Sequence, residues 1–304
     1  MRLIDLFAGC GGMSLGFQNA GYEIGAAFDN WEPAIKVYRR NFADHPVIKH
    51  DLSVFDDVDL FSRFEPEMII GGPPCQDFSS AGKRDESLGK ADLTITFARI
   101  ITAVEPRWFV MENVERAAGS RAYADAAALL RQAGYGLTQA ILDASLCGVP
   151  QRRKRLFLIG ELHGQHDALQ PLLQGCLASR SLTLREYFGD TLGIDHYYRH
   201  PRSYERRGVF SIDEPSPTVR GVNRPIPPTY RRHPGDTSTV TPNVRPLTTR
   251  ERGQVQTFPE AFVFEGTKTD IEQMIGNAVP VKLAEYVARC IRVYMDCTSN
   301  RRIS

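Results

Sequence analysis

The chain has 304 residues, of which 42% are hydrophobic and 24% charged, so it is long enough for one large core and a smaller lobe. A formal charge of +1 excludes a chain that is strongly basic or acidic throughout, and no apolar stretch approaches the length of a membrane span. The six cysteines contain no Cys-x-x-Cys pair and lie far apart, which excludes a disulfide-stabilised secreted domain and indicates a reduced, cytoplasmic protein.

The first predicted element is a strand over residues 3–7, with no secretory signal before it. It ends in the glycine loop Gly9-Cys10-Gly11-Gly12, and a helix over residues 14–21 follows. A glycine loop between a strand and a helix lets the backbone approach a ligand closely and points helix amides at it. The fingerprint Gly-x-Gly-x-x-Gly would need glycine where Ser14 stands, so an NAD site is excluded.

Acidic residues follow the next two predicted strands. Asp29 ends the strand over residues 23–28, and Asp51 follows the strand over residues 47–49. An acid in the first of these places can accept hydrogen bonds from both ribose hydroxyls. A glycine loop with two such acids fits a nucleoside that carries no phosphates, although strand-end caps or turn formers are an alternative interpretation of both acids.

The strand over residues 67–70 stops at Gly71-Gly72-Pro73-Pro74 and then presents Cys75. The two prolines fix φ and remove two backbone donors, so Cys75 is held on a stiff turn at the carboxyl end of the strand. Open α/β sheets place ligand chemistry at that end. We interpret Cys75 as a nucleophile, the alternative being a buried packing cysteine. The charged, apolar-poor residues 79–92 suit a lid that a polyanion orders.

Two further motifs belong to the same predicted sheet. The apolar strand over residues 109–114 ends in Glu112 and Asn113, and the run from Gln151 to Arg155 leads into a strand over residues 156–160. A period of two would put Gln151, Arg153 and Arg155 on one face. Helices are expected over residues 94–104 and 122–134, and residues 142–146 are expected to be a connector. This alternation predicts an α/β protein with a mostly parallel, Rossmann-like sheet covered by helices on both faces.

The character of the sequence changes over residues 189–270. Nine of the nineteen prolines fall between Pro201 and Pro246, which predicts a small, irregular, β-rich lobe. Residues 180–252 contain thirteen arginines, no lysine and eight acidic residues, so the lobe is basic and suits phosphate contact, with solvated arginine loops as the alternative. Arginine and asparagine can also read guanine and adenine edges. His196 and His200 lack further ligands, and no metal is expected.

An amphipathic helix over residues 281–295 closes the sequence and needs a core to pack against.

Six collinear motifs together resemble the DNA (cytosine-5)-methyltransferase family of restriction-modification type. They are Asp5-Leu6-Phe7-Ala8-Gly9-Cys10-Gly11-Gly12, Gly72-Pro73-Pro74-Cys75-Gln76 with Phe78-Ser79, Glu112-Asn113-Val114, Gln151-x-Arg153-x-Arg155, Arg245-Pro246-Leu247-Thr248-x-Arg250-Glu251 and Gly276-Asn277-Ala278-Val279-Pro280. The segment from about residue 190 to 244 lies outside the resemblance. The resemblance implies that the terminal helix returns to pack beside the first strand. Residues 1–188 and 271–304 would then form a discontinuous catalytic and cofactor-binding domain, with residues 189–270 as a separate target-recognition domain.

The resemblance implies that the nucleoside is S-adenosylmethionine, with S-adenosylhomocysteine as product. Phe7 would pack on the adenine, Gly9 and Gly11 would line the methionine, Asp29 would take the ribose, and Asp51 the adenine amine. Family members commonly have glutamate where Asp29 stands. The remaining residues expected around the cofactor are Cys10, Gly12, Asn30, Leu52, Pro73, Leu93, Asn277 and Ala278.

The resemblance also implies a chemistry. Cys75 adds to C6 of cytosine, Glu112 donates a proton to N3, and Arg155 holds O2 with Arg153 as a neighbouring anchor. Asn113 and Gln151 are expected to fix the turns around them. The base that removes the C5 proton stays open, and the target cytosine has to be flipped out of the duplex.

Double-stranded DNA is the expected partner, read in a short specific sequence. The residues expected to contact it are Ser79, Lys83, Arg84, Thr218, Arg220, Asn223 and Arg224. We expect a bacterial, cytoplasmic, monomeric enzyme on nucleoid DNA, with a cognate restriction endonuclease as functional partner. Two alternatives stay open: an RNA cytosine-5 methyltransferase of the same fold, and a non-catalytic, sequence-specific DNA binder.

Overall fold

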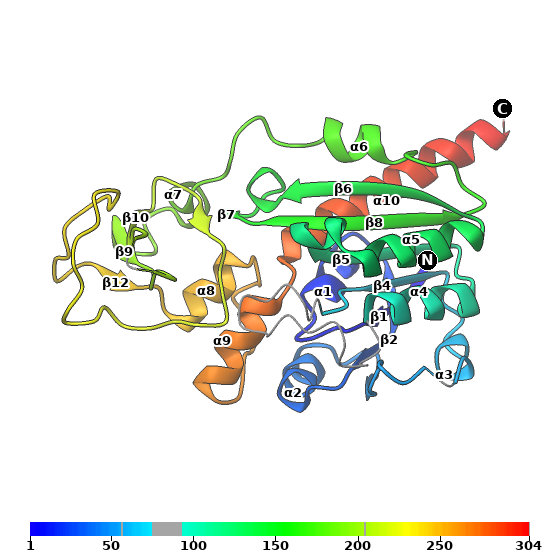
Figure 1. The fold of residues 1–304 in the computed structure, drawn as a ribbon, viewed down its shortest axis with the longest axis horizontal. Coiled ribbons are helices and arrows are strands. Elements are labelled where there is room, and N and C mark those ends of the chain that lie inside the picture. The colour runs from blue at the N-terminus through cyan, green and yellow to red at the C-terminus, as the bar shows by residue number, and fades with distance from the viewer. Residues whose placement is uncertain (56, 75–92, 204, 304) are drawn as a thin grey trace.

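The computed structural model describes residues 1–55, 57–74, 93–203 and 205–303, and within these ranges a seven-stranded sheet forms the larger region (Figure 1). The strand order is β3-β2-β1-β4-β5-β8-β6, and β8 runs antiparallel to both of its neighbours. The other neighbours are parallel, which confirms the predicted α/β fold. The strands are β1 (Arg2–Leu6), β2 (Glu23–Asp29), β3 (Val47–Lys49), β4 (Met68–Gly71), β5 (Trp108–Val114), β6 (Tyr135–Asp143) and β8 (Lys154–Leu162).

Helices cover both faces of this sheet, as the alternating pattern predicts. Alternate residues of β1 show the division, because Leu3 belongs to one apolar core and Ile4 to the other. The first face carries α1 (Gly12–Asn19), α2 (Glu32–Asn41), α6 (Gln170–Gly175) and α10 (Val281–Ile303), and the second carries α3 (Asp59–Ser62), α4 (Leu93–Val104) and α5 (Arg121–Gln132). The short helices η1 (Glu115–Gly119) and η2 (Ala144–Leu146) follow β5 and β6.

The two ends of the chain meet in the first core. Leu283, Ala284, Val287 and Ile291 of α10 are fully buried together with Leu3 and Phe17. Figure 1 shows α10, orange to red, passing behind the green strands β8 and β6, and α10 contacts α1, which is blue. Residues from both termini therefore build one core, as the predicted terminal helix requires. Within the described ranges no helix combines the length and the apolar character needed to cross a membrane.

The sequence did not predict β6, and residues 142–146 are not the simple connector expected. Leu142 and Asp143 end the strand, and η2 follows. Gly136 and the buried Thr138 interrupt the apolar run at the start of β6, so its pattern does not indicate a strand. Gly136 is needed because a Cβ there would lie 2.3 Å from the carbonyl oxygen of Gly164.

The smaller region is irregular and partly β-stranded. In its described part β9 (His196–Tyr198) pairs with β10 (Val209–Ser211) and β12 (Arg245–Pro246), while β11 (Ser216–Pro217) pairs with β7 (Gln151–Arg152). The helices α7 (Leu184–Phe188), α8 (Thr249–Val255) and α9 (Lys268–Asn277) surround it. Its core contains Leu184 and Ile275, so α7 and α9 pack with this lobe.

The division at residues 188/189 and 270/271 stays a prediction. Its second boundary falls inside α9, so a boundary that leaves this helix whole would precede Lys268 or follow Asn277.

Candidate active site

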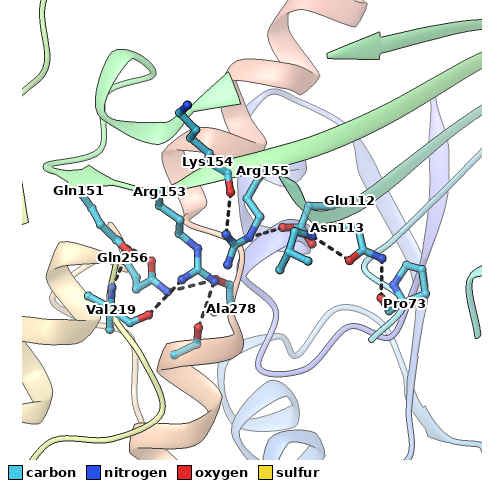
Figure 2. Close-up of polar contacts among 12 residues, drawn as sticks. Pro73, Glu112, Asn113, Gln151, Arg153, Lys154, Arg155, Val219, Gln256 and Ala278 are labelled. Atoms are coloured by element: carbon cyan, nitrogen blue, oxygen red, sulfur yellow. Dashed lines mark hydrogen bonds and ion pairs between the residues drawn. The ribbon is translucent and has the colours of Figure 1, made fainter. Parts of the chain in front are cut away.

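Glu112 and Arg155 form a buried ion pair at one end of the sheet. Strands β5 and β8 pair antiparallel with Val114 opposite Arg155, which brings the two side chains together. Arg155 Nε lies 2.8 Å from Glu112 Oε1, and the side chains are 13% and 11% exposed (Figure 2). Burial raises the pKa of Glu112 above its ordinary value, and Arg155 and Arg153 lower it in part. A carboxyl group with a raised pKa is suited to proton donation near neutral pH.

Asn113 connects the end of β5 to the turn after β4. Its Nδ2 donates a hydrogen bond to the carbonyl oxygen of Pro73 (3.1 Å), and its Oδ1 accepts one from the amide of Val114 (2.8 Å). The turn-fixing role predicted for Asn113 is confirmed. A Cβ on Gly72 would lie 3.2 Å from Glu112 Oε2, so this turn passes directly over the carboxyl group. The predicted nucleophile Cys75 follows two residues after Pro73 and lies outside the described residues, as do Ser79, Lys83 and Arg84.

The run from Gln151 to Arg155 alternates between buried and exposed side chains. Gln151 and Arg153 are 0% and 2% exposed, whereas Arg152 and Lys154 face solvent. Period two therefore puts Gln151 and Arg153 inside, as predicted. Gln151 also fixes the chain around it, because its Oε1 accepts a hydrogen bond from the amide of Val219 (2.8 Å).

The contacts of Arg153 differ from those of the predicted anchor beside the flipped cytosine. Its Nη1 donates to the carbonyl oxygen of Val219 (3.1 Å), and its Nη2 donates to those of Gly276 (3.0 Å) and Ala278 (3.1 Å). The guanidinium therefore points at the lobe and at the end of α9, away from the ion-paired oxygen of Glu112 (Figure 2). Burial and the neighbouring Arg155 lower the pKa of Arg153 well below its ordinary value.

The glycine loop after β1 and the end of β2 form the candidate cofactor site. Asp29 accepts hydrogen bonds from the amides of Gly9 (2.7 Å) and Trp31 (2.8 Å), one on each carboxylate oxygen. Burial raises the pKa of Asp29. Gly9 has φ +56°, and apart from Gly9 and its two chain neighbours no described residue has an atom within 4 Å of a Cβ placed there. Phe7, with φ +61°, holds a strained backbone beside this open space, which suits a ligand site.

The other predicted cofactor residues differ in their surroundings. Gly11 is buried, and a Cβ on Gly12 would lie 2.3 Å from the carbonyl oxygen of Val279, so this glycine serves packing. Cys10 is 2% exposed and packs with Val37 and Met274, so only its backbone is left for a ligand, and its place around the cofactor stays a prediction.

The remaining residues of the cofactor group lie at strand ends or near the terminal segment. Asn30 and Asp51 are exposed after β2 and β3, and Leu52 is buried. Pro73 follows β4 and is buried, Leu93 begins α4, and Asn277 is exposed. The carbonyl oxygen of Ala278 is occupied by hydrogen bonds from Arg153 and Gln256. Because parallel neighbouring strands end at one edge, the residues that follow β1 to β4 converge there.

A buried polar chain beneath the glycine loop did not emerge from the sequence. Ser14 Oγ donates to Asp5 Oδ2 (2.5 Å), Tyr38 donates to Ser14 Oγ (2.8 Å), and the Tyr38 hydroxyl lies 2.8 Å from His45 Nε2. Burial raises the pKa of Asp5 to about 7. The signal for it in the sequence was Asp5, an acidic residue inside an otherwise apolar strand.

The smaller lobe contains an arginine-lined pocket of about 30 Å³. Arg199 donates to the carbonyl oxygen of Thr218 (2.7 Å), Arg220 to that of His200, and Arg252 pairs with Glu272. Burial lowers the pKa of Arg199 to about 10. Arg199 and Arg252 lie outside the predicted DNA contacts, and only their place in an arginine-rich stretch pointed to them. The pocket lining is Tyr197, Tyr198, Arg199, His200, Ser216, Pro217, Val219, Arg220, Val222, Asn223, Leu247 and Arg252.

The predicted DNA readers in this lobe are not equally available. Arg224 is exposed, and Arg220 is half-buried in the pocket. The Thr218 hydroxyl donates to the carbonyl oxygen of Arg152 (2.9 Å). Asn223 Nδ2 donates to the carbonyl oxygen of Leu247 (2.9 Å) and to Glu272 (3.2 Å), so both of its amide hydrogens are used inside the lobe. The role of Asn223 as a base reader therefore needs revision.

Comparison with known proteins places this geometry in a family. The family description "C-5 cytosine-specific DNA methylase" matches residues 1–292. The Type II methyltransferase M.HgiDI of Herpetosiphon aurantiacus is 58% identical over 305 residues, which cover 100% of this chain and 98% of the relative. The Type II methyltransferase M.HindV of Haemophilus influenzae is 57% identical, with 96% of each chain covered.

Solved structures agree at the level of the fold. The S. pombe Dnmt2 methyltransferase superposes with a TM-score of 0.71 at 18% identity, covering 98% of this chain and 99% of that one. An Entamoeba histolytica methyltransferase, EhMeth, gives 0.70 at 15% identity, covering 97% and 98%. Both likenesses confirm the α/β fold expected from the strand and helix pattern and the methyltransferase fold that the resemblance implied.

Proposed function

Since this chain belongs to the family of C-5 cytosine-specific DNA methylases and is a DNA (cytosine-5-)-methyltransferase, we propose that it takes its methyl group from S-adenosylmethionine. The acceptor is C5 of a cytosine flipped out of a short, specific double-stranded sequence. The reaction proceeds through a covalent bond between Cys75 and C6. The observation that carries this proposal is the buried pair of Glu112 and Arg155 beneath the turn that leads to Cys75.

The residues of the chain divide the chemistry among them. The Cys75 thiolate adds to C6, and the electron pair of the C5=C6 bond is displaced towards N3, where Glu112 donates a proton. Arg155 holds the cytosine O2 and keeps Glu112 oriented. When bound, S-adenosylmethionine supplies an electrophilic methyl group for C5. Loss of the C5 proton to a base still to be identified then re-forms the C5=C6 double bond and expels the Cys75 thiolate, while N3 returns its proton to Glu112.

The candidate cofactor site fits S-adenosylmethionine in the character of its residues. The space beside Gly9 is open, Phe7 lies two residues earlier and is only partly buried against the second core, and Asp29 stands at the adjacent strand end. Asp29 already accepts from two backbone amides, and each carboxylate oxygen keeps a second acceptor position for a ribose hydroxyl. In this proposal Asp29, whose side chain is shorter than the glutamate common in the family, both shapes the loop and accepts hydrogen bonds from the ribose.

We assign DNA binding to the lobe and to residues that follow Cys75 outside the described ranges. Arg220 and Arg224, together with Ser79, Lys83 and Arg84, are the proposed contacts, and residues 189–270 form the proposed recognition domain. Flipping is required because neither face of C6 is accessible in stacked DNA. We further propose that the protein acts as a monomer and that a restriction endonuclease of the same specificity is its functional partner.

A mechanism-based substrate tests the covalent step. A pool of duplexes with randomised sequence, in which 5-fluorocytosine replaces every cytosine of one strand, contains the unknown site with the modified base at the target. With S-adenosylmethionine present, methyl transfer should occur once and the enzyme should stay attached, because fluorine cannot leave as a proton does. We expect a protein–DNA adduct that survives boiling in detergent, measured by gel mobility. Cytosine DNA should give methylation without the adduct.

Two cysteine variants provide the matched comparison. Cys75→Ala should abolish adduct and methylation, whereas Cys176→Ala removes an exposed thiol elsewhere and should leave both unchanged. Methylation by a folded Cys75→Ala protein would falsify the covalent mechanism. An adduct with 5-fluorocytosine RNA but none with DNA would instead favour the RNA methyltransferase.

A further inference from the structure

The backbone of Val219, just before the proposed reader Arg220, is held at both of its polar groups. Its amide donates to Gln151 Oε1 (2.8 Å), and its carbonyl oxygen accepts from Arg153 Nη1 (3.1 Å). One residue earlier, the Thr218 hydroxyl donates to the carbonyl oxygen of Arg152 (2.9 Å). Strands β11 and β7 extend this contact by pairing Ser216 with Gln151. The start of the recognition segment, residues 218–224, is therefore attached to the run that begins at Gln151.

A third side chain ties the same point to the end of α9. Gln151 Nε2 donates to Gln256 Oε1 (2.7 Å), and Gln256 Nε2 donates to the carbonyl oxygens of Ile275 (2.5 Å) and Ala278 (3.1 Å). Gln151 and Gln256 are 0% exposed and Arg153 is 2% exposed. A buried donor or acceptor that loses its partner costs about 1–3 kcal/mol, so a shift of any of the three segments is penalised. We call Gln151, Arg153 and Gln256 the interlobe clamp.

The clamp lies between the recognition segment and the chemistry. Arg153 holds Val219, and two residues further along the same chain Arg155 holds Glu112. On the other side Val219 leads directly to Arg220 in the arginine-lined pocket. Figure 2 shows Val219, Arg153, Arg155 and Glu112 in one succession. A displacement of the lobe is thus transmitted to the catalytic carboxyl group through very few bonds.

We propose that Gln151, Arg153 and Gln256 are positioning residues that fix the register between the recognition segment and Glu112, and that this coupling makes methyl transfer depend on the DNA sequence. The inference rests on the proposed function. On the correct sequence the lobe seats fully and the flipped cytosine meets Glu112 and Arg155 in register. On a sequence with one wrong base pair the lobe seats differently, and the clamp turns that difference into a misplaced cytosine. A misplacement of about 1 Å can cost about 100-fold in rate.

Arg153→Lys is the informative variant. Lysine keeps the positive charge and a buried stem, but one ammonium group cannot span the three carbonyl oxygens that the guanidinium fork reaches. The matched control is Arg152→Lys, the same substitution one residue away at an exposed side chain that makes none of these contacts. Gln151→Glu is the second variant, because it keeps the acceptor for Val219 and removes the donor to Gln256.

The measurement uses the full chain, S-adenosylmethionine and a plasmid library with a randomised segment, read by bisulfite sequencing over time. The sequence methylated fastest by the wild-type protein defines the cognate site. We expect Arg153→Lys and Gln151→Glu to lower the ratio of cognate to single-mismatch methylation rates by about tenfold or more, with the cognate rate itself reduced. Arg152→Lys should keep the wild-type ratio. Calorimetric binding of S-adenosylmethionine and the thermal midpoint identify folded protein.

Two results would overturn the inference. An unchanged ratio in folded Arg153→Lys or Gln151→Glu protein, with only a lower thermal midpoint, assigns the clamp to stability alone. An equal fall in rate on every sequence assigns it to catalysis without discrimination. Failure of the proposed function looks different, because the wild-type protein itself would then methylate no cytosine, or methylate without sequence preference, and both proposals would be overturned together.

Discussion

At the scale of single residues, two opposing effects act on the pKa of Glu112, because burial raises it and two guanidinium groups lower it. Burial has the larger effect, so the pKa of this carboxyl group lies above its ordinary value in the folded protein. The protonated form donates the proton to N3. Its population falls as pH rises through the raised pKa, so the rate of the chemical step should decline on that side of the profile.

Removing the nearer cation should move this decline in a defined direction. Arg155 lowers the pKa of Glu112, so Arg155→Met should raise that pKa further and shift the falling part of the pH profile to higher pH, at a lower absolute rate. Lys154→Met removes the same charge from the next residue, whose Nζ pairs with Glu115 (3.6 Å), and should leave the profile in place. The rate of single-turnover methylation, measured against pH for the wild-type protein and both variants, tests this shift. Glu112→Gln should lose the decline and about 10²–10⁴ in rate, and an unmoved profile in Arg155→Met would contradict the assignment of the acid.

The residue scale is also where the sequence misleads most. Period two predicted which residues after Gln151 point inwards, and this was correct for Gln151 and Arg153. What Arg153 meets there was not predictable, because its partners Val219, Gly276 and Ala278 come from segments distant in the chain. The partners of Asn223, predicted to read a base, were hidden for the same reason, since its side-chain amide donates to Leu247 and Glu272. A side chain's type suggests its chemistry, but its neighbours decide whether that chemistry is available.

At the scale of elements, the contact between α1 and α10 joins the two ends of the chain. A Cβ on Gly16 of α1 would lie 2.5 Å from Ala284 Cβ and 2.6 Å from the carbonyl oxygen of Val281. The helices pack this closely only because position 16 has no side chain. The sequence predicted both helices, and the amphipathic pattern of the second required a core. The closeness of the contact was hidden, because a glycine within a helix is ordinarily read as unfavourable.

Substitution of this glycine should therefore destabilise the protein against the usual trend. Gly16→Ala should lower the free energy of unfolding by about 1–3 kcal/mol, since the added methyl group overpacks the helix contact. Gly175→Ala is the matched control, because no atom of the described residues lies within 4 Å of its Cβ position, and there alanine should be neutral or stabilising by about 0.5–1 kcal/mol. Urea unfolding measures both variants. Equal effects at the two positions would show that α10 can move away from α1 without cost.

At the scale of the whole molecule, the two ligands are assigned to regions with separate cores. The candidate cofactor site lies at the ends of β1 and β2, where the first core and the core around Tyr38 meet the glycine loop. The proposed DNA contacts lie on the lobe, whose core includes Tyr197, Phe210 and Leu247. The six motifs allow residue-level predictions for the first region, because glycines and strand-end acids have fixed places in such a sheet. Only the composition of the lobe could be predicted, since a loop sequence without periodicity does not show which residues pair or face inwards.

This separation predicts that binding of the two ligands can be weakened independently. Arg224→Ala removes an exposed guanidinium from the lobe and should lower DNA affinity, with the slope of log affinity against log salt reduced by about one if the contact is a phosphate. Its affinity for S-adenosylmethionine should equal that of the wild-type protein. Phe7→Ala should do the reverse, because the aromatic ring proposed to pack on the adenine is lost while the lobe is untouched. Arg121→Ala is the control, since its side chain is 92% exposed on α5 of the larger region.

Calorimetry with the cofactor and salt-dependent DNA titration provide the two affinities. A loss of cofactor affinity in Arg224→Ala equal to its loss of DNA affinity would mean that the two regions respond as one unit, and the assignment of separate sites would be wrong.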